Sequence, residues 1–109
     1  TMSEDYTLEW LADGGARLGG RLTFGTCPAL FAQLERHGAA TPVDSPVDLA
    51  AVEQVDSAGL ALLLEWQARQ KASGRRLALV NAPGSLLRLA QLADAIELLN
   101  LSGRDEAAA

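Results

Sequence analysis

Hydrophobic and polar residues alternate at the start of the chain. The stretch YTLEWL (6–11) alternates and contains aromatic and β-branched residues, which is typical of a strand. ARLGGRLTF (16–24) predicts the returning strand, and its Gly19–Gly20 pair indicates a bulge. ADGG (12–15) lies between the two segments and is typical of a turn. The pattern therefore predicts a hairpin.

Helical spacing follows in GTCPALFAQLERHGAA (25–40). Thr26 can cap this helix, Pro28 lies where a first turn tolerates proline, and Gly38 can end it. The expected buried stripe consists of Leu30, Phe31 and Leu34.

The rest of the chain alternates between short strands and helices. In order, the pattern predicts a loop at 41–46, a short buried strand at 47–50 with a connector to 56, a helix at 57–72 closed by Gly74, a strand at 75–82, a helix at 83–94 with a stripe of Leu86, Leu89 and Leu92, and a final short strand or helix end at 95–101. Residues 1–5 and 102–109 are polar, and we expect a flexible N-terminus and a disordered tail. Thr1 precedes Met2 and is interpreted as a residue added for expression.

The predicted order is β-β-α-β-α-β-α within one domain, residues 6–101. Strand–helix–strand crossovers imply parallel pairing, whereas the opening hairpin adds an antiparallel pair. The sequence therefore predicts the α/β class, with a small mixed sheet packed against helices.

Composition narrows the kind of partner. Hydrophobic residues make up 49% of the 109 residues but aromatics only 5%, so the core must be aliphatic. The net charge of -5 argues against nucleic acid and against anionic lipid surfaces, because both require clustered Lys and Arg. The longest apolar run, 60–64, is too short to enter and cross a bilayer, and the acidic N-terminus does not resemble a signal peptide. We expect a cytoplasmic protein.

Residues for catalysis or metal binding are sparse. Cys27 is the only cysteine and His37 the only histidine, and both fall in the helix predicted at 25–40. We interpret Cys27 as a small hydrophobic residue and His37 as solvated or C-capping. No Cys and His cluster has metal-ligand spacing, and no Gly-x-Ser-x-Gly elbow or P-loop is present. The sequence predicts no catalytic residue, no metal and no cofactor.

The informative stretch is VEQVDSAGLALLLEWQ (52–67). Asp56 and Ser57 precede an apolar helix, and either can accept hydrogen bonds from its unpaired N–H groups. Gly59 removes side-chain bulk and permits close approach by another backbone or an anion. Taken alone, these residues are consistent with a helix cap and nothing else.

The helix itself has more apolar surface than one stripe requires. Leu60, Leu63 and Leu64 can face the sheet, whereas Leu62 and Trp66 are i, i+4 neighbours that form a second ridge. This ridge is either covered by a neighbouring helix or left for a partner. Both alternatives are open at the level of sequence.

The element order and VDSAGLALLL (55–64) closely resemble the STAS domain family over about residues 6–101. The family signature Asp-[Ser/Thr]-x-Gly-Leu stands here as Asp56, Ser57, Ala58, Gly59 and Leu60. The resemblance implies a protein-docking module rather than an enzyme, with a partner-binding site formed by Asp56, Ser57, Ala58, Gly59, Leu60, Leu62 and Trp66.

Two branches of the family fit this pattern differently. In anti-sigma factor antagonists, the phosphorylated serine usually stands immediately before the glycine, where this chain has Ala58. Ser57 occupies the position at which the cytoplasmic STAS subunit of the Mla-type ABC complex carries a hydroxyl. The resemblance therefore implies a subunit that docks on the ATPase of a phospholipid transporter of Gram-negative bacteria, within a complex that includes a membrane permease. It would lie peripheral to the inner membrane through this partner.

The alternative is an antagonist of an anti-sigma factor that is phosphorylated on Ser57.

Overall fold

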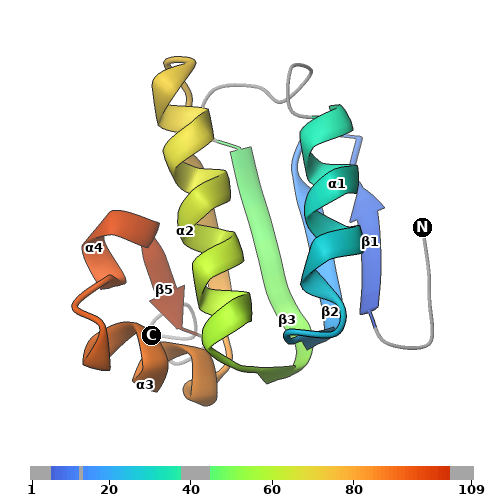
Figure 1. Ribbon diagram of the computed structural model, residues 1–109. Coiled ribbons are helices and arrows are strands. Elements are labelled where there is room, and N and C mark those ends of the chain that lie inside the picture. The colour runs from blue at the N-terminus through green and yellow to red at the C-terminus, as the bar shows by residue number, and fades with distance from the viewer. Residues whose placement is uncertain (1–5, 13, 38–44, 104–109) are drawn as a thin grey trace.

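The computed structural model describes residues 6–12, 14–37 and 45–103 (Figure 1). Its five strands form one sheet in the order β1-β2-β3-β4-β5. The elements are β1 (Tyr6–Trp10), β2 (Ala16–Leu22), α1 (Cys27–His37), β3 (Ser45–Val55), α2 (Ser57–Ala72), β4 (Leu77–Ala82), α3 (Gly84–Leu92), α4 (Ile96–Leu99) and β5 (Leu101–Gly103). Strand β1 is antiparallel to β2, and each later pair is parallel. The predicted hairpin and mixed α/β sheet are confirmed.

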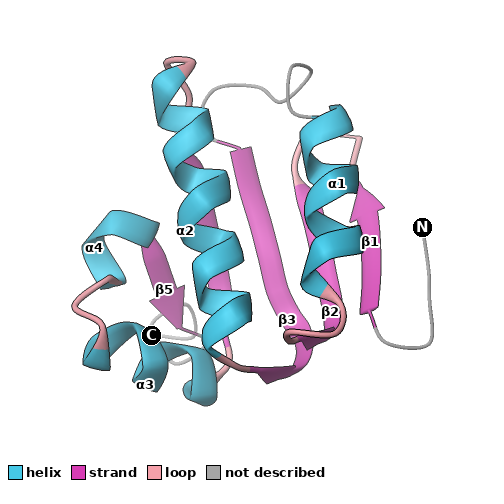
Figure 2. Cartoon of the chain, viewed as in Figure 1, coloured by secondary structure: helices cyan, strands magenta, loops and turns pink. Residues whose placement is uncertain are grey.

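Helices α1 and α2 lie side by side over one face of the sheet (Figures 1 and 2). Both helices begin at the edge where β2 and β3 end, so the turns that precede them are neighbours in space. Helices α3 and α4 pack on the other flank of α2. Helix α2 is thus covered on three sides, by the sheet and by helices on both flanks.

The core is aliphatic, as the composition predicts. Its fully buried side chains are mostly leucines from every layer, among them Leu8, Leu18, Leu30, Leu49, Leu63, Leu79 and Leu86. The predicted stripe of the last long helix is only partly correct, because Leu86 is buried but Leu92 is 81% exposed. Leu92 stands at the last position of α3, whose buried residues are Leu86 and Ala90.

Strand β3 is longer than predicted. It runs for 11 residues to Val55, where the sequence predicts a strand at 47–50 and then a connector. The extra length pairs with β2, up to Leu22 opposite Val55, and the register shifts on both sides of Gly19–Gly20. The predicted bulge therefore lies in this pairing. Because Glu53 and Gln54 are exposed, the hydrophobic pattern does not mark this part as a strand.

The C-terminal end also differs from prediction. The segment 95–101 contains a short helix, α4, and the start of a strand, β5, whereas the sequence predicts one or the other. Strand β5 continues to Gly103, so residues 102 and 103 belong to the sheet and not to a tail. Asn100 has φ 53, and this left-handed residue turns the chain from α4 into β5. The predictions for residues 1–5, for Gly38, for most of the 41–46 loop and for residues 104–109 lie outside the described residues.

Candidate functional site at the start of helix α2

The carboxylate of Asp56 joins two loops. Its Oδ1 accepts hydrogen bonds from the backbone N–H groups of Ala58 (2.9 Å) and Gly59 (3.2 Å), so Asp56 is the N-cap of α2. Its Oδ2 accepts from the N–H of Phe24 (3.1 Å), in the turn between β2 and α1. The predicted cap is confirmed, and the same side chain also holds the neighbouring turn in place.

Burial alone would raise the pKa of Asp56, but hydrogen bonds from backbone N–H groups oppose it. Phe24, Gly59 and Ala58 donate to the carboxylate and lower its pKa below the ordinary value. The charged form is therefore the one that this site stabilises. The negative charge also lies at the helix N-terminus, where the helix dipole favours it.

Gly59 is needed for close packing against β2. A Cβ at this position would clash with the backbone carbonyl oxygen of Leu22 and would lie 2.7 Å from Cγ2 of Val55. The same Leu22 carbonyl accepts a hydrogen bond from the N–H of Asp56 (3.2 Å). Of the two uses predicted for the glycine, approach by a backbone is the one observed. Gly59 is buried and presents no surface.

Ser57 and Ala58 lie at the outer side of this loop. Ser57 is the first residue of α2 and is exposed, and Ala58 is half-buried. The loop therefore offers one accessible hydroxyl, at Ser57, beside the bound carboxylate of Asp56.

The apolar residues predicted to continue the site lie in the core instead. Leu60 is 7% exposed, Leu62 5% and Trp66 3%. The alternative in which Leu62 and Trp66 form an exposed ridge for a partner is wrong, because α1 on one flank and α3 and α4 on the other cover this helix. Sequence periodicity could not distinguish a helix packed on both flanks from one with a free face.

The structure adds Phe24 to the candidate site. The sequence pattern predicts this residue as the last one of a strand. Strand β2 ends at Leu22, and Phe24 lies in the turn with 83% of its surface exposed. Its backbone N–H donates to Asp56, the residue before Ser57, so the turn that carries this exposed aromatic residue is tied to the start of α2. An aromatic residue directly before Gly25-Thr26 was the available signal, since the strand pattern weakens there. We call Phe24, Asp56, Ser57 and Ala58 the tip surface.

Cys27 stands near the tip surface but is buried. Burial raises the pKa of its thiol, the charge of Asp56 raises it further, and a hydrogen bond with Thr26 acts in the opposite direction. A thiol with a raised pKa is a weak nucleophile at neutral pH, which is consistent with its interpretation as a small hydrophobic residue. The side chain of His37 lies outside the described part of the chain.

Within residues 6–12, 14–37 and 45–103, no group of three or more His, Cys, Asp and Glu side chains could hold a metal ion. No helix in the same ranges is long and apolar enough to cross a membrane.

A protein-family model described as "Mlab, STAS domain" matches residues 11–101. The chain belongs to the STAS domain family. No curated protein matches the chain. The residues that the match covers include β2 to α4 and the whole tip surface of this STAS domain.

Solved structures share the STAS fold. The crystal structure of tm1081 from Thermotoga maritima, provisionally described as an anti-sigma factor antagonist, is 17% identical with a TM-score of 0.73, over 94% of this chain and 90% of that one. The anti-sigma factor antagonist SpoIIAA in its unphosphorylated form is 17% identical with a TM-score of 0.63, over 80% and 82%. The murine anion transporter Slc26a9 is 16% identical with a TM-score of 0.65. That match covers 83% of this chain, which spans only 16% of the transporter's length.

Proposed function

We propose that this STAS domain is a non-catalytic docking subunit that binds the ATPase of an Mla-type ABC transporter and supports its assembly or activity. The observation that carries the proposal is the match of residues 11–101 to the family model described as "Mlab, STAS domain". The subunit would be cytoplasmic and peripheral to the inner membrane through its partner, in a complex that moves phospholipids and maintains outer-membrane lipid asymmetry. The fold is also shared by part of a transporter chain, murine Slc26a9, which is consistent with such a role.

The tip surface is suited to docking. Phe24 supplies an exposed apolar ring, and the neighbouring Ser57 supplies a hydroxyl that can donate or accept. Asp56 fixes both loops before any partner arrives, so little conformational entropy is lost on binding. A partner would bury the ring of Phe24 and pair with the hydroxyl of Ser57. Leu60, Leu62 and Trp66 then support the tip surface from the core and do not touch the partner.

A charge introduced at position 57 should weaken binding of the partner without destabilising the folded domain. Ser57→Asp would place an unpaired carboxylate in a desolvated contact, which weakens binding. The same charge at a helix N-terminus stabilises the isolated domain or leaves its stability unchanged. We therefore expect loss of partner without loss of fold. Ser57→Asn is the matched control, because it has nearly the same size as Asp, carries no charge and is also a good residue near a helix N-terminus.

The test uses four baits on detergent-solubilised lysate of the source organism: the wild type, Ser57→Asp, Ser57→Asn and Phe24→Ala. We expect mass spectrometry to identify an ABC ATPase and its permease with the wild type, reduced amounts with Ser57→Asn, and neither with Ser57→Asp or Phe24→Ala. Equal capture by all four baits would remove the tip surface from the interface. Absence of any ABC ATPase from the wild-type eluate would count against the transporter role.

The alternative is an anti-sigma factor antagonist, and the shared fold of tm1081 and SpoIIAA favours it. Ser57 is exposed at the first position of α2, where the helix dipole favours the negative charge of a phosphate. Ala58 counts against this role, because it stands where that branch usually carries its serine. Incubation with lysate and ATP, followed by intact-mass measurement, distinguishes the two. A mass gain of one phosphate that Ser57→Ala abolishes would establish the phosphorylated regulator.

A further inference from the structure

A hollow of about 490 Å³ lies between the last turn of α2 and helix α4. Its lining consists of Lys71, Asp94, Ile96, Glu97 and Leu98. Four of these five residues are exposed, so the hollow is an open surface feature and not an enclosed small-molecule site. Lys71 is 14 residues along α2 from Ser57, about 21 Å at the rise of an α-helix, so the hollow is separate from the tip surface.

Helix α4 is anchored to the domain by its last residue and by the residue that follows it. The carbonyl oxygen of Leu99 accepts a hydrogen bond from Nε2 of Gln67 (3.0 Å), and the Leu99 side chain is fully buried. Nδ2 of Asn100 donates to the carbonyl oxygen of Leu77 (3.0 Å). Because Leu99 faces the core, its neighbour Leu98 is turned outward and is 57% exposed.

Exposed apolar side chains are concentrated in two parts of the molecule. Of the described residues, three large apolar side chains are exposed: Phe24 (83%), Leu92 (81%) and Leu98 (57%). Phe24 belongs to the tip surface, whereas Leu92 ends α3 and Leu98 lies in α4, six residues later. The region of the hollow is therefore the second place at which exposed apolar surface indicates an interaction.

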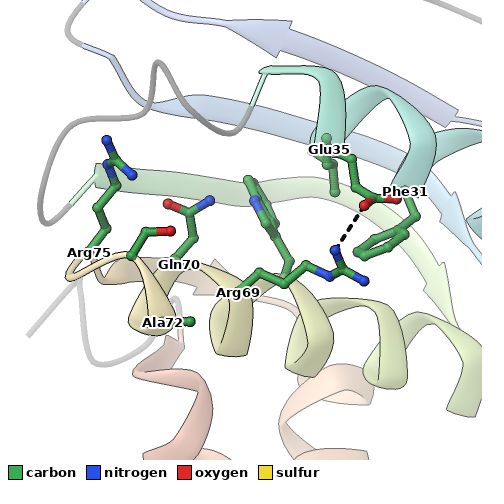
Figure 3. Close-up of a pocket in the computed structure, with 9 residues that line it drawn as sticks. Phe31, Glu35, Arg69, Gln70, Ala72 and Arg75 are labelled. Carbon is green, nitrogen blue, oxygen red and sulfur yellow. Dashed lines mark hydrogen bonds and ion pairs between the residues drawn. The ribbon is translucent and has the colours of Figure 1, made fainter.

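The charges around the hollow are not paired within the domain. Among the described residues, no ion pair joins Lys71, Asp94 or Glu97 to another charged group. In the cleft of about 390 Å³ between α1 and α2, by contrast, Arg69 is paired with Glu35 (2.9 Å), as Figure 3 shows. The lining of the hollow thus carries two carboxylates and one ammonium group, and its net charge is negative.

This charge pattern selects the class of partner. The two carboxylates attract a cation, and they repel the phosphates of nucleic acid and of anionic lipid. The net charge of -5 of the whole chain acts in the same direction. An apolar surface flanked by carboxylates fits an apolar side chain that stands beside a Lys or Arg, as both do on an amphipathic helix.

We propose that the hollow is a second docking surface, which binds a basic amphipathic helix of a protein partner. An apolar side chain of the partner covers Leu98 and Ile96, and a Lys or Arg of the partner pairs with Asp94 or Glu97. Lys71 adds a positive charge of its own, so the surface favours a helix with few cations over a polybasic run. Because the hollow is separate from the tip surface, both can be occupied at once.

The test uses three synthetic peptides of about four helical turns and the amide signals of the whole chain in a ¹H–¹⁵N NMR spectrum. The first peptide has Leu on one helix face and Lys on the other. The second has Glu in place of each Lys, and the third keeps Lys but has Ser in place of each Leu. The signals of residues 94–98 report on the hollow, and those of Phe24 and Ser57 are the internal control at the tip surface.

We expect the first peptide to shift the signals of residues 94–98 saturably and to leave those of Phe24 and Ser57 nearly unchanged. The second should not bind, because its carboxylates meet those of the hollow. The third should bind at least about fivefold more weakly than the first, since it leaves Leu98 exposed. Equal binding of the first and third peptides would overturn the apolar contact. Equal shifts at the tip surface and the hollow, or no saturable shift, would overturn the site.

Two variants separate the apolar contact from the charge contact. Leu98→Ser removes the first, and Asp94→Asn with Glu97→Gln removes the second. Each should weaken binding of the first peptide at least about fivefold. Glu9→Gln with Glu53→Gln is the matched control, since it removes the same number of charges from β1 and β3, and it should leave the affinity within about twofold.

Equal weakening by the two charge-removing pairs would show that the peptide responds to net charge alone, and this result would overturn the docking surface. All the substituted side chains are exposed, so we expect the variants to fold as the wild type does. The ranking of the three peptides on the wild type needs no variant, and it tests the proposal even if a substitution disturbs folding.

Discussion

The two ends of helix α2 differ in whether their polar groups are paired. At the N-terminal end, Asp56 accepts three backbone hydrogen bonds and ties the turn before α1 to the start of α2. At the C-terminal end, the indole N–H of Trp66 and the amide oxygen of Gln70 have no partner among the described residues. The N-terminal end is complete within the domain, whereas the C-terminal end retains unused hydrogen-bonding capacity.

This difference decides which polar groups of α2 a partner can use. The tip surface is preorganised, and its Phe24 and Ser57 are exposed. A partner binds there by matching the shape of this surface. The unpaired groups at the other end are enclosed by the protein and present almost no surface to a partner. Gln67 lies between Trp66 and Gln70 and is buried as they are, but its amide is fully paired.

The largest effect should come from Gln67→Met. The substitution keeps the volume but removes three hydrogen bonds to the backbone of Leu77 and Leu99. Both leucines are fully buried, so water cannot replace the lost partners. We expect the free energy of unfolding, measured in urea, to fall by about 3 kcal/mol.

Gln70→Met is the matched control for this change. Because its amide oxygen is already unpaired, we expect stability to be unchanged or to rise by about 1 kcal/mol. Equal losses in the two variants would mean that Gln70 is paired in solution, and the contrast between the two ends of α2 would fail.

Gly59→Ala should give the next largest effect. An alanine inside a helix is ordinarily favoured over glycine by about 1 kcal/mol. Here the added Cβ would clash with the carbonyl oxygen of Leu22 and with Val55, so we expect a net loss of about 2 kcal/mol. Gly84→Ala is the control, since nothing lies within 4 Å of its Cβ position. A more stable Gly59→Ala variant would show that α2 can move away from β2 at little cost.

Local patterns were sufficient for several features of the fold. The hairpin, the span of α2 and the cap at Asp56 follow from alternation, helical spacing and the preference of N–H groups for a carboxylate. Each of these depends on residues close together in the sequence. Asp56, Ser57 and Ala58 of the tip surface could be located from sequence for the same reason.

Features that depend on distant neighbours were not predictable. Strand β3 continues through Glu53 and Gln54 because β2 supplies its partners, not because its own pattern alternates. Leu62 and Trp66 are buried because α2 is covered by α1, which precedes it in the sequence, and by α3 and α4, which follow it. Phe24 is exposed because Asp56, 32 residues later, holds its backbone in the turn. The cleft of about 390 Å³ that Phe31 and Arg69 line between α1 and α2 depends likewise on the packing of the two helices, which periodicity does not specify.

The smallest effect concerns the charge of Asp56. Asparagine can also cap a helix, so Asp56→Asn removes the charge and keeps an acceptor. The pKa of Asp56 is lowered in the folded state, so its ionisation stabilises the fold at pH values above the unfolded pKa of about 3.9. That contribution is lost as the pH falls through the lower, folded pKa. We expect the wild type to exceed Asp56→Asn by about 0.5 kcal/mol at pH 7, and the gap to close on acidification below about pH 4.

Urea unfolding of both proteins between pH 7 and pH 2.5 measures this gap, and taking the difference removes the contribution of carboxylates that the two share. Asp56→Ala serves as the control, because it removes the cap itself and should cost about 1 kcal/mol at pH 7. A gap between wild type and Asp56→Asn that widened on acidification would mean that the protonated carboxyl is the form favoured by folding. The N–H groups of Phe24, Ala58 and Gly59 would then not stabilise its charge, and the N-terminal end of α2 would be no better paired than the other.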